Sequence, residues 1–188
     1  MITSAGASRV TSLNTYVVDP VHSCVQFRVR HLGFSRITGR FDTFSAVLRM
    51  NPVSLGSLAV EARIDAASVN TGDAVRDAHL RSADFFEADR YPEILFKSTR
   101  TRDVRVDALV LCGRLTLHGI TRPVELAVTY LGEARDLDGR ERIAFEAHTR
   151  INRKDFGLTW NSVLETGGLL VGEDVEVMLA VQAVRTAG

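Results

Sequence analysis

The chain is poor in the residues that build cross-linked or metal-centred proteins. Its 188 residues include two cysteines, Cys24 and Cys112, and five histidines. Two cysteines are too few for a disulfide-stabilised scaffold, so the fold must rest on an apolar core. The histidines show neither H-x-H nor H-E-x-x-H spacing, the usual signatures of zinc sites. We therefore expect free thiols and no metal or other cofactor, and the sequence leaves a disulfide between Cys24 and Cys112 open because it does not give the strand order.

An excess of charge of one sign is also missing. Lys and Arg total 23, Asp and Glu total 23, and the formal net charge is zero. Bulk electrostatics therefore attract neither nucleic acid nor an anionic membrane, and we expect no nucleic-acid partner.

Long apolar runs are absent as well. No stretch approaches the ~18 continuous apolar residues of a membrane-spanning helix, so we expect no transmembrane segment. Residues 1–14 are small and polar, without a positively charged start followed by an apolar run, so we expect no signal peptide. The predicted organisation is a flexible tail over 1–14 and one domain over 15–188, in the cytoplasm.

What the chain does contain is alternation of apolar and polar residues, the period of half-buried strands. In the first run, Val25, Phe27 and Val29 alternate with polar neighbours. Eight antiparallel strands are most simply closed into an all-β barrel, because closure removes exposed edges. A two-sheet sandwich satisfies the same periodicity. The predicted strands lie near 15–31, 36–50, 57–68, 93–102, 106–118, 121–132, 141–153 and 173–185.

One segment breaks the strand rhythm. From Asp73 to Phe86 the spacing is helical, with Asp73 as the N-cap. Acid precedes base at i,i+3 and i,i+4, which is typical of a solvated helix face. We interpret this helix as a lid or plug across the barrel rather than an active site. The residues predicted to face inward are Val75, Ala78, Ser82 and Phe85 or Phe86.

Four segments, in order along the chain, carry a family resemblance. They are DPVHSCVQFRVRHLGFSRITGRF, RDAHLRSADFFEADRYPEILFKST, GRLTLHGITRPVEL, and INRKDFGLTWN followed by GGLLVGEDVEV. Together they resemble the YceI-like family of polyisoprenoid-binding proteins, over about residues 16–182. The resemblance implies an eight-stranded antiparallel, extended lipocalin-like barrel with one helix, enclosing a long apolar tunnel. Its expected ligand is a long-chain isoprenoid or other amphiphilic lipid: a polyprenyl phosphate, a prenylated quinone or a fatty-acid derivative. The resemblance leaves a homodimer open.

Strand parity and the plug together provide a candidate tunnel lining. A strand of a dozen residues, tilted ~40°, spans about 30 Å of barrel axis. Burying ~400 Å² of apolar ligand is worth on the order of 10 kcal/mol before ordering costs. The same residue types would equally fill a packed core. The candidate ligand-binding residues are Val25, Phe27, Val29, Phe41, Leu58, Val60, Ile64, Phe85, Phe86, Leu111, Leu115, Val128, Phe145, Phe156 and Trp160.

The expected function is a non-catalytic lipid-binding and transport protein. In INRKDFGLTW, Arg153 or Lys154 is a candidate contact for an anionic head group. Two alternatives stay open from the residues. One is a metal-assisted hydrolase built around His22, which shares a strand face with Cys24. The other is a packed-barrel stress or interaction module without a ligand.

Overall fold

The structure is a computed structural model that describes residues 12–163 and 169–186. Within these ranges, eleven strands form a single sheet in which every pairing is antiparallel. The strands are β1 (Asn14–Val18), β2 (Cys24–His31), β3 (Ser35–Phe41), β4 (Phe44–Asn51), β5 (Ser54–Asp65), β6 (Val69–Asn70), β7 (Glu93–Arg102), β8 (Ala108–Leu117), β9 (Ile120–Arg135), β10 (Glu141–Asn152) and β11 (Val171–Arg185). The helices are the 3₁₀ turns η1 (Pro20–His22), η2 (Ala66–Ser68) and η3 (Arg153–Phe156), and the α-helix α1 (Ala74–Arg81).

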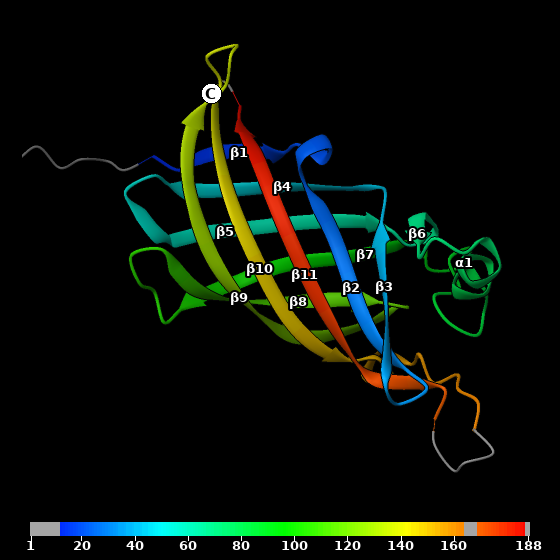
Figure 1. The fold of residues 1–188 in the computed structure, drawn as a ribbon. Helices are drawn as coiled ribbons and strands as arrows, with labels where there is room; N and C mark the ends of the chain where they lie inside the picture. The colour runs from blue at the N-terminus through cyan, green and yellow to red at the C-terminus, as the bar shows by residue number, and fades with distance from the viewer. Residues whose placement is uncertain (1–11, 164–168, 187–188) are drawn as a thin grey trace, which may run out of the picture.

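Eight of these strands close into a barrel, as predicted (Figure 1). The ring runs β1-β4-β5-β7-β8-β9-β10-β11, and β11 returns to β1 through the pair Tyr16 and Arg185. The same edge of β11 pairs with β2 farther toward the start of β11, so β2, β3 and β6 extend the wall beyond the ring. The prediction of eight separate runs was too coarse, because the first run is split by η1 and the second by the turn at residues 42–43.

The corner between β1 and β2 is fixed by Asp19. Its Oδ1 accepts the backbone N–H of Val21 at 3.1 Å, which caps η1. Its Oδ2 accepts a bond from Arg142 Nη1 at 2.7 Å and lies 2.9 Å from His22 Nδ1. The hydrogen bonds from Arg142 and then His22 hold the pKa of Asp19 far below its ordinary value. The Asp19 carboxylate is therefore ionised, and its bond to Arg142 ties the corner to β10.

The helix is shorter than predicted and turns a different face inward. Asp73 is the N-cap, since its side chain accepts the N–H of Arg76 at 2.9 Å, but α1 ends at Arg81. Val75 is 83% exposed, and the inward stripe expected at Val75, Ala78 and Ser82 is wrong. Asp77 is buried instead, where it accepts the N–H and hydroxyl of Thr71. A polar bond therefore overrides the apolar period that the sequence indicated.

The side chains inside the barrel form two clusters, one toward each end. One cluster is centred on Tyr16, Leu111 and Ile143. The other is centred on Phe41, Val69 and Phe156, and the residues after α1 pack into it. Cys24 and Cys112 are free thiols on the non-adjacent strands β2 and β8. None of the helices in the described ranges has the length and apolarity needed to cross a membrane.

Candidate functional site: the barrel interior

The first cavity lies within the closed ring. Its volume is about 160 Å³, and Ser45 and Thr149 are its only polar side chains among the described residues. Inward-facing residues from β4, β5, β8, β9, β10 and β11 line it, because every second residue of each strand points toward the axis. This volume is an order of magnitude above the ~10–15 Å³ that holds one water. The ring is therefore not packed solid.

A second apolar cavity, of about 150 Å³, adjoins the first toward α1. β2, β11 and the residues after α1 line it. The two cavities share Val25, Ile64, Leu115 and Val177 in their walls. They therefore follow one another through the interior, and these four side chains mark the junction.

The end of the second cavity is covered by aromatic side chains. Phe86 lies edge-on to Phe41, with ring centroids 5.6 Å apart, and Phe41 in turn contacts Phe27 at 5.6 Å. Phe85 is held from outside by Trp160, whose ring centroid is 5.2 Å away. The segment after α1, which carries Phe85 and Phe86, thus closes the barrel interior at this end, beside β6 (Figure 1). We call this segment the cover.

A second contact fastens this cover to the β8–β9 hairpin. His118 and Gly119 form its two-residue turn, both with positive φ, as type I′ hairpins require. The His118 ring packs edge-on against Tyr91 at 4.8 Å, and its Nδ1 lies 3.2 Å from the carbonyl oxygen of Phe156. Its buried Nε2 lies 3.4 Å from Glu87 Oε2, without hydrogen-bond alignment. The hairpin, η3 and the cover therefore meet at this histidine.

Most of the predicted lining residues face the two cavities, and two do not. Phe156 is the last residue of η3 and is buried in the second core cluster, and Trp160 packs against Phe85. The predicted residues that line one or both cavities are Val25, Phe27, Val29, Phe41, Leu58, Val60, Ile64, Phe85, Phe86, Leu111, Leu115, Val128 and Phe145.

Several lining residues escaped the sequence-based selection. Phe44 follows the turn at residues 42–43, which interrupts the alternation of the predicted strand over 36–50, and Phe96 lies on β7. Val177 and Leu179 have the same parity on β11 as Val175 and Val181, so strand parity could have identified them.

Arg153 and Lys154, the candidates for a head-group contact, are both engaged within the protein. Arg153 is 4% exposed, and its guanidinium donates to the carbonyl oxygens of Leu158, Trp160, Val171 and Gly172. Its burial lowers the pKa of this arginine from its ordinary value. Lys154 Nζ pairs with Glu173. Arg153 is a structural clamp on the start of β11.

The histidine named in the hydrolase alternative lies outside the barrel cavities. The His22 side chain is 54% exposed and contacts Asp19. Over the described ranges, no three His, Cys, Asp or Glu side chains come together as metal ligands, so the pair of His22 and Cys24 gains no third ligand there.

Known proteins share both this sequence pattern and this fold. Residues 16–183 match the family model described as the YceI-like domain. A UPF0312 protein of Vibrio cholerae is 38% identical over 145 residues, covering 76% of this chain and 77% of the relative.

Two solved structures are similar in fold. The YceI protein of Campylobacter jejuni superposes with a TM-score of 0.73 at 30% identity, covering 84% of this chain and 90% of that one. A polyisoprenoid-binding domain from Saccharophagus degradans, implicated in plant cell wall breakdown, has a TM-score of 0.64 at 21% identity, with 91% and 98% covered. The matched model, the relative and the shared barrel agree: this chain belongs to the YceI-like family.

Proposed function

We propose that the protein is a non-catalytic carrier that holds the hydrocarbon chain of a long-chain isoprenoid, or of a similar amphiphilic lipid, inside its barrel. The observation that carries this proposal is the pair of adjoining apolar cavities that follow one another through the interior. An empty apolar cavity costs stability unless something fills it, and the lining offers dispersion contacts rather than polar ones.

The cavity walls offer no charged side chain with a free hydrogen-bonding group among the described residues, which favours a hydrocarbon over a charged ligand. Arg153 is the charged residue in the walls, and its N–H groups are already bonded to backbone carbonyls. A charged head group inside would lose its hydration without a partner, which is expensive. The chain of the lipid therefore occupies the interior, and its head group stays at the covered end or in water.

Similarity to a known protein also supports the carrier proposal. The Saccharophagus degradans domain, which shares the fold, is described as polyisoprenoid-binding. This supports a prenyl chain as the bound hydrocarbon. Polyprenyl phosphates and prenylated quinones are the first ligands to test.

The experiment combines native mass spectrometry of the purified protein with mass spectrometry of its organic extract. We expect one long-chain species bound at a stoichiometry of one, or uptake of one added polyprenyl phosphate or prenylated quinone. A protein that is free of lipid and takes up neither compound contradicts the carrier proposal and favours the interaction module without a ligand. A role in transport, a cytoplasmic location and a homodimer stay predictions.

A further inference from the structure

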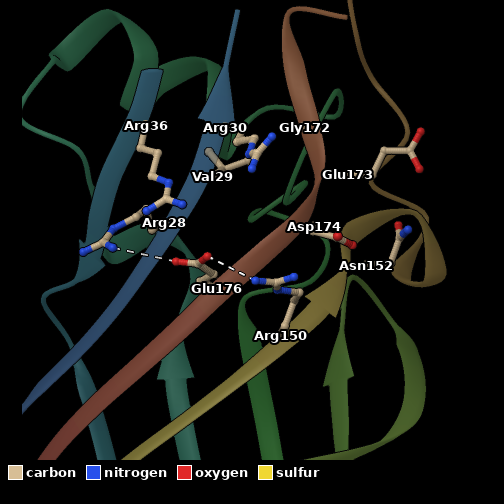
Figure 2. Close-up of a pocket in the computed structure, with 10 residues that line it drawn as sticks. All are labelled: Arg28, Val29, Arg30, Arg36, Arg150, Asn152, Gly172, Glu173, Asp174 and Glu176. Carbon is tan, nitrogen blue, oxygen red and sulfur yellow. Dashed lines mark hydrogen bonds and ion pairs between the residues drawn. The ribbon is translucent and has the colours of Figure 1, made fainter. Parts of the chain in front are cut away.

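A polar groove lies on the outer wall of the barrel, away from the apolar interior. It has a volume of about 540 Å³ and runs across β2, β3, β10 and β11 (Figure 2). Four arginines lie in it: Arg28, Arg30, Arg36 and Arg150. The adjoining residues of β2, Phe27 and Val29, face the second cavity, so strand alternation sends Arg28 and Arg30 outward.

Strand register places the four guanidinium groups in one region. Arg30 on β2 is directly opposite Arg36 on β3. Arg28 is opposite Glu176 on β11, and Glu176 is opposite Arg150 on β10. Figure 2 shows Glu176 between the side chains of Arg28 and Arg150. The groove is therefore built from a row of three residues and a neighbouring pair of arginines.

The acids in the groove do not balance these arginines. Glu176 is shared between Arg28, at 3.7 Å, and Arg150, at 3.4 Å. Glu173 is engaged by Lys154, and Asp174 is the remaining acid of the wall. Over the described ranges, neither Arg30 nor Arg36 forms an ion pair with a carboxylate. Like charges directly opposite one another destabilise a sheet, so this pair costs stability that a bound anion would recover.

The backbone beside the arginine pair is fixed by two features. Between Val171 and Val175, four residues of β11 span two of β2, which is a bulge. Arg153 clamps the bulge from inside through the carbonyl oxygens of Val171 and Gly172. A Cβ on Gly172 would lie 3.1 Å from Cβ of Arg30, so glycine lets β11 approach Arg30 this closely. The groove is thus preformed and held in place.

We propose that this groove binds a phosphate group, as free pyrophosphate or as the head group of an anionic phospholipid. The planar guanidinium matches two phosphate oxygens at once, and several arginines around one groove are the arrangement that recognises a multiply charged anion. The arginines of the groove line the second cavity nowhere, and Val29 of β2 is the residue that borders both.

The first test is calorimetric titration of the intact protein with pyrophosphate at low ionic strength. We expect saturable binding that weakens with added sodium chloride. The double variant R30Q/R36Q should bind at least about tenfold more weakly, since a hydrogen bond to a charged group is worth about a tenfold change in affinity or more. The matched control is R40Q/R63Q, which removes two strand arginines that pair with Asp42 and Glu93.

A third variant is expected to gain affinity. Glu176→Gln removes the carboxylate that competes for Arg28 and Arg150, so pyrophosphate should bind more tightly than to the wild type. Thermal melts without the anion show whether each variant is folded. A groove that is only a solvated charged surface would give no gain in Glu176→Gln and equal losses in the two double variants.

The second arm separates the two sources of phosphate. Phe34, which is 84% exposed, lies in the turn between Arg30 and Arg36. If the source is a membrane, vesicles containing phosphatidylglycerol should sediment the protein, phosphatidylcholine vesicles should not, and Phe34→Ser should weaken sedimentation. If the source is free phosphate, Phe34→Ser should leave pyrophosphate binding unchanged. Absence of binding in both arms, or binding that R30Q/R36Q does not reduce, overturns the proposal.

Discussion

The ring of Phe27 lies against Gly39 on the neighbouring strand, where a Cβ on residue 39 would clash with Cζ of that ring. The two residues are directly paired in the β2–β3 register. Phe27 lines the second cavity and contacts Phe41, which contacts Phe86 in the cover. The absent side chain at residue 39 therefore gives Phe27 room to rest over β3 instead of filling the interior.

Gly39→Ala should displace the Phe27 ring toward the cavity. We expect lipid uptake to fall several-fold and the free energy of unfolding to drop by about 1–3 kcal/mol, the usual cost of overpacking. Uptake is measured by native mass spectrometry and stability by urea denaturation. Gly56→Ala is the control, because its new Cβ would meet Val104 at an ordinary 3.4 Å. Equal uptake by the two variants would contradict the role given to Gly39.

Trp160 holds the cover in place, and its removal should speed lipid exchange. Its ring contacts His79 at 4.7 Å and Phe85 at 5.2 Å, on the outer side of the segment that closes the second cavity. We expect Trp160→Ala to raise the release rate of a fluorescent prenyl probe several-fold and to increase hydrogen exchange in α1. Val75→Ala, at an exposed position of the same helix, should change neither. An unchanged release rate in Trp160→Ala would show that lipid does not pass this cover.

Arg153 should matter for stability and not for ligand charge. Arg153→Met leaves several buried carbonyl oxygens without their donor, and we expect a loss of about 3 kcal/mol in the free energy of unfolding. Lys154→Met, at the exposed neighbouring position, should cost less than about 1 kcal/mol. Denaturant melts check both values. If folded Arg153→Met instead lost affinity for an anionic lipid and retained full stability, the side chain would be a head-group ligand.

The hydrogen bonds from Arg142 to the carboxylates of Asp19 and Asp136 should make part of the free energy of unfolding depend on pH. Arg142 lowers the pKa of both Asp19 and Asp136, to which it donates hydrogen bonds at 2.7 and 2.9 Å. A depressed carboxyl pKa contributes stability that is present above the unfolded-state pKa, near 3.9, and is lost as pH falls through the folded-state pKa. Arg142→Gln should therefore melt below the wild type at pH 7.

The difference in melting temperature between Arg142→Gln and the wild type should narrow progressively below about pH 5. Thermal melts across this range measure it. Arg63→Gln, which removes an exposed pair with Glu93, should track the wild type throughout. A difference between Arg142→Gln and the wild type that stays constant down to pH 3 would mean that Arg142 acts through packing and not through the two carboxylates.

The barrel could be predicted from sequence because each long strand repeats its inward face several times. Val25, Phe27 and Val29 show this period on β2, and each lines a cavity. Phe156 and Trp160 lie in INRKDFGLTW, where no strand period establishes an inward face, and neither lines either of the two apolar cavities. Periodic segments thus allow side-chain direction to be inferred, and loops do not.

Features that depend on pairing between distant strands could not be predicted. The inward face of α1 is set by the bond from Thr71 to Asp77, which no periodicity indicates. The opposition of Arg30 and Arg36 follows from the β2–β3 register, and the role of Arg153 follows from the bulge in β11. Register and bulges depend on contacts across the sheet, and a single sequence does not contain them explicitly.

The most direct test of the carrier account compares one substitution on the two faces of a single strand. Ala62 on β5 lines the first cavity, whereas Ala59 on the same strand is exposed on the outer wall. Native mass spectrometry after incubation with a polyprenyl phosphate or a prenylated quinone measures lipid bound to Ala62→Trp and to Ala59→Trp. The account predicts that Ala62→Trp remains folded and loses bound lipid, while Ala59→Trp binds as the wild type does. Equal binding by both folded variants would contradict a lipid chain inside the barrel.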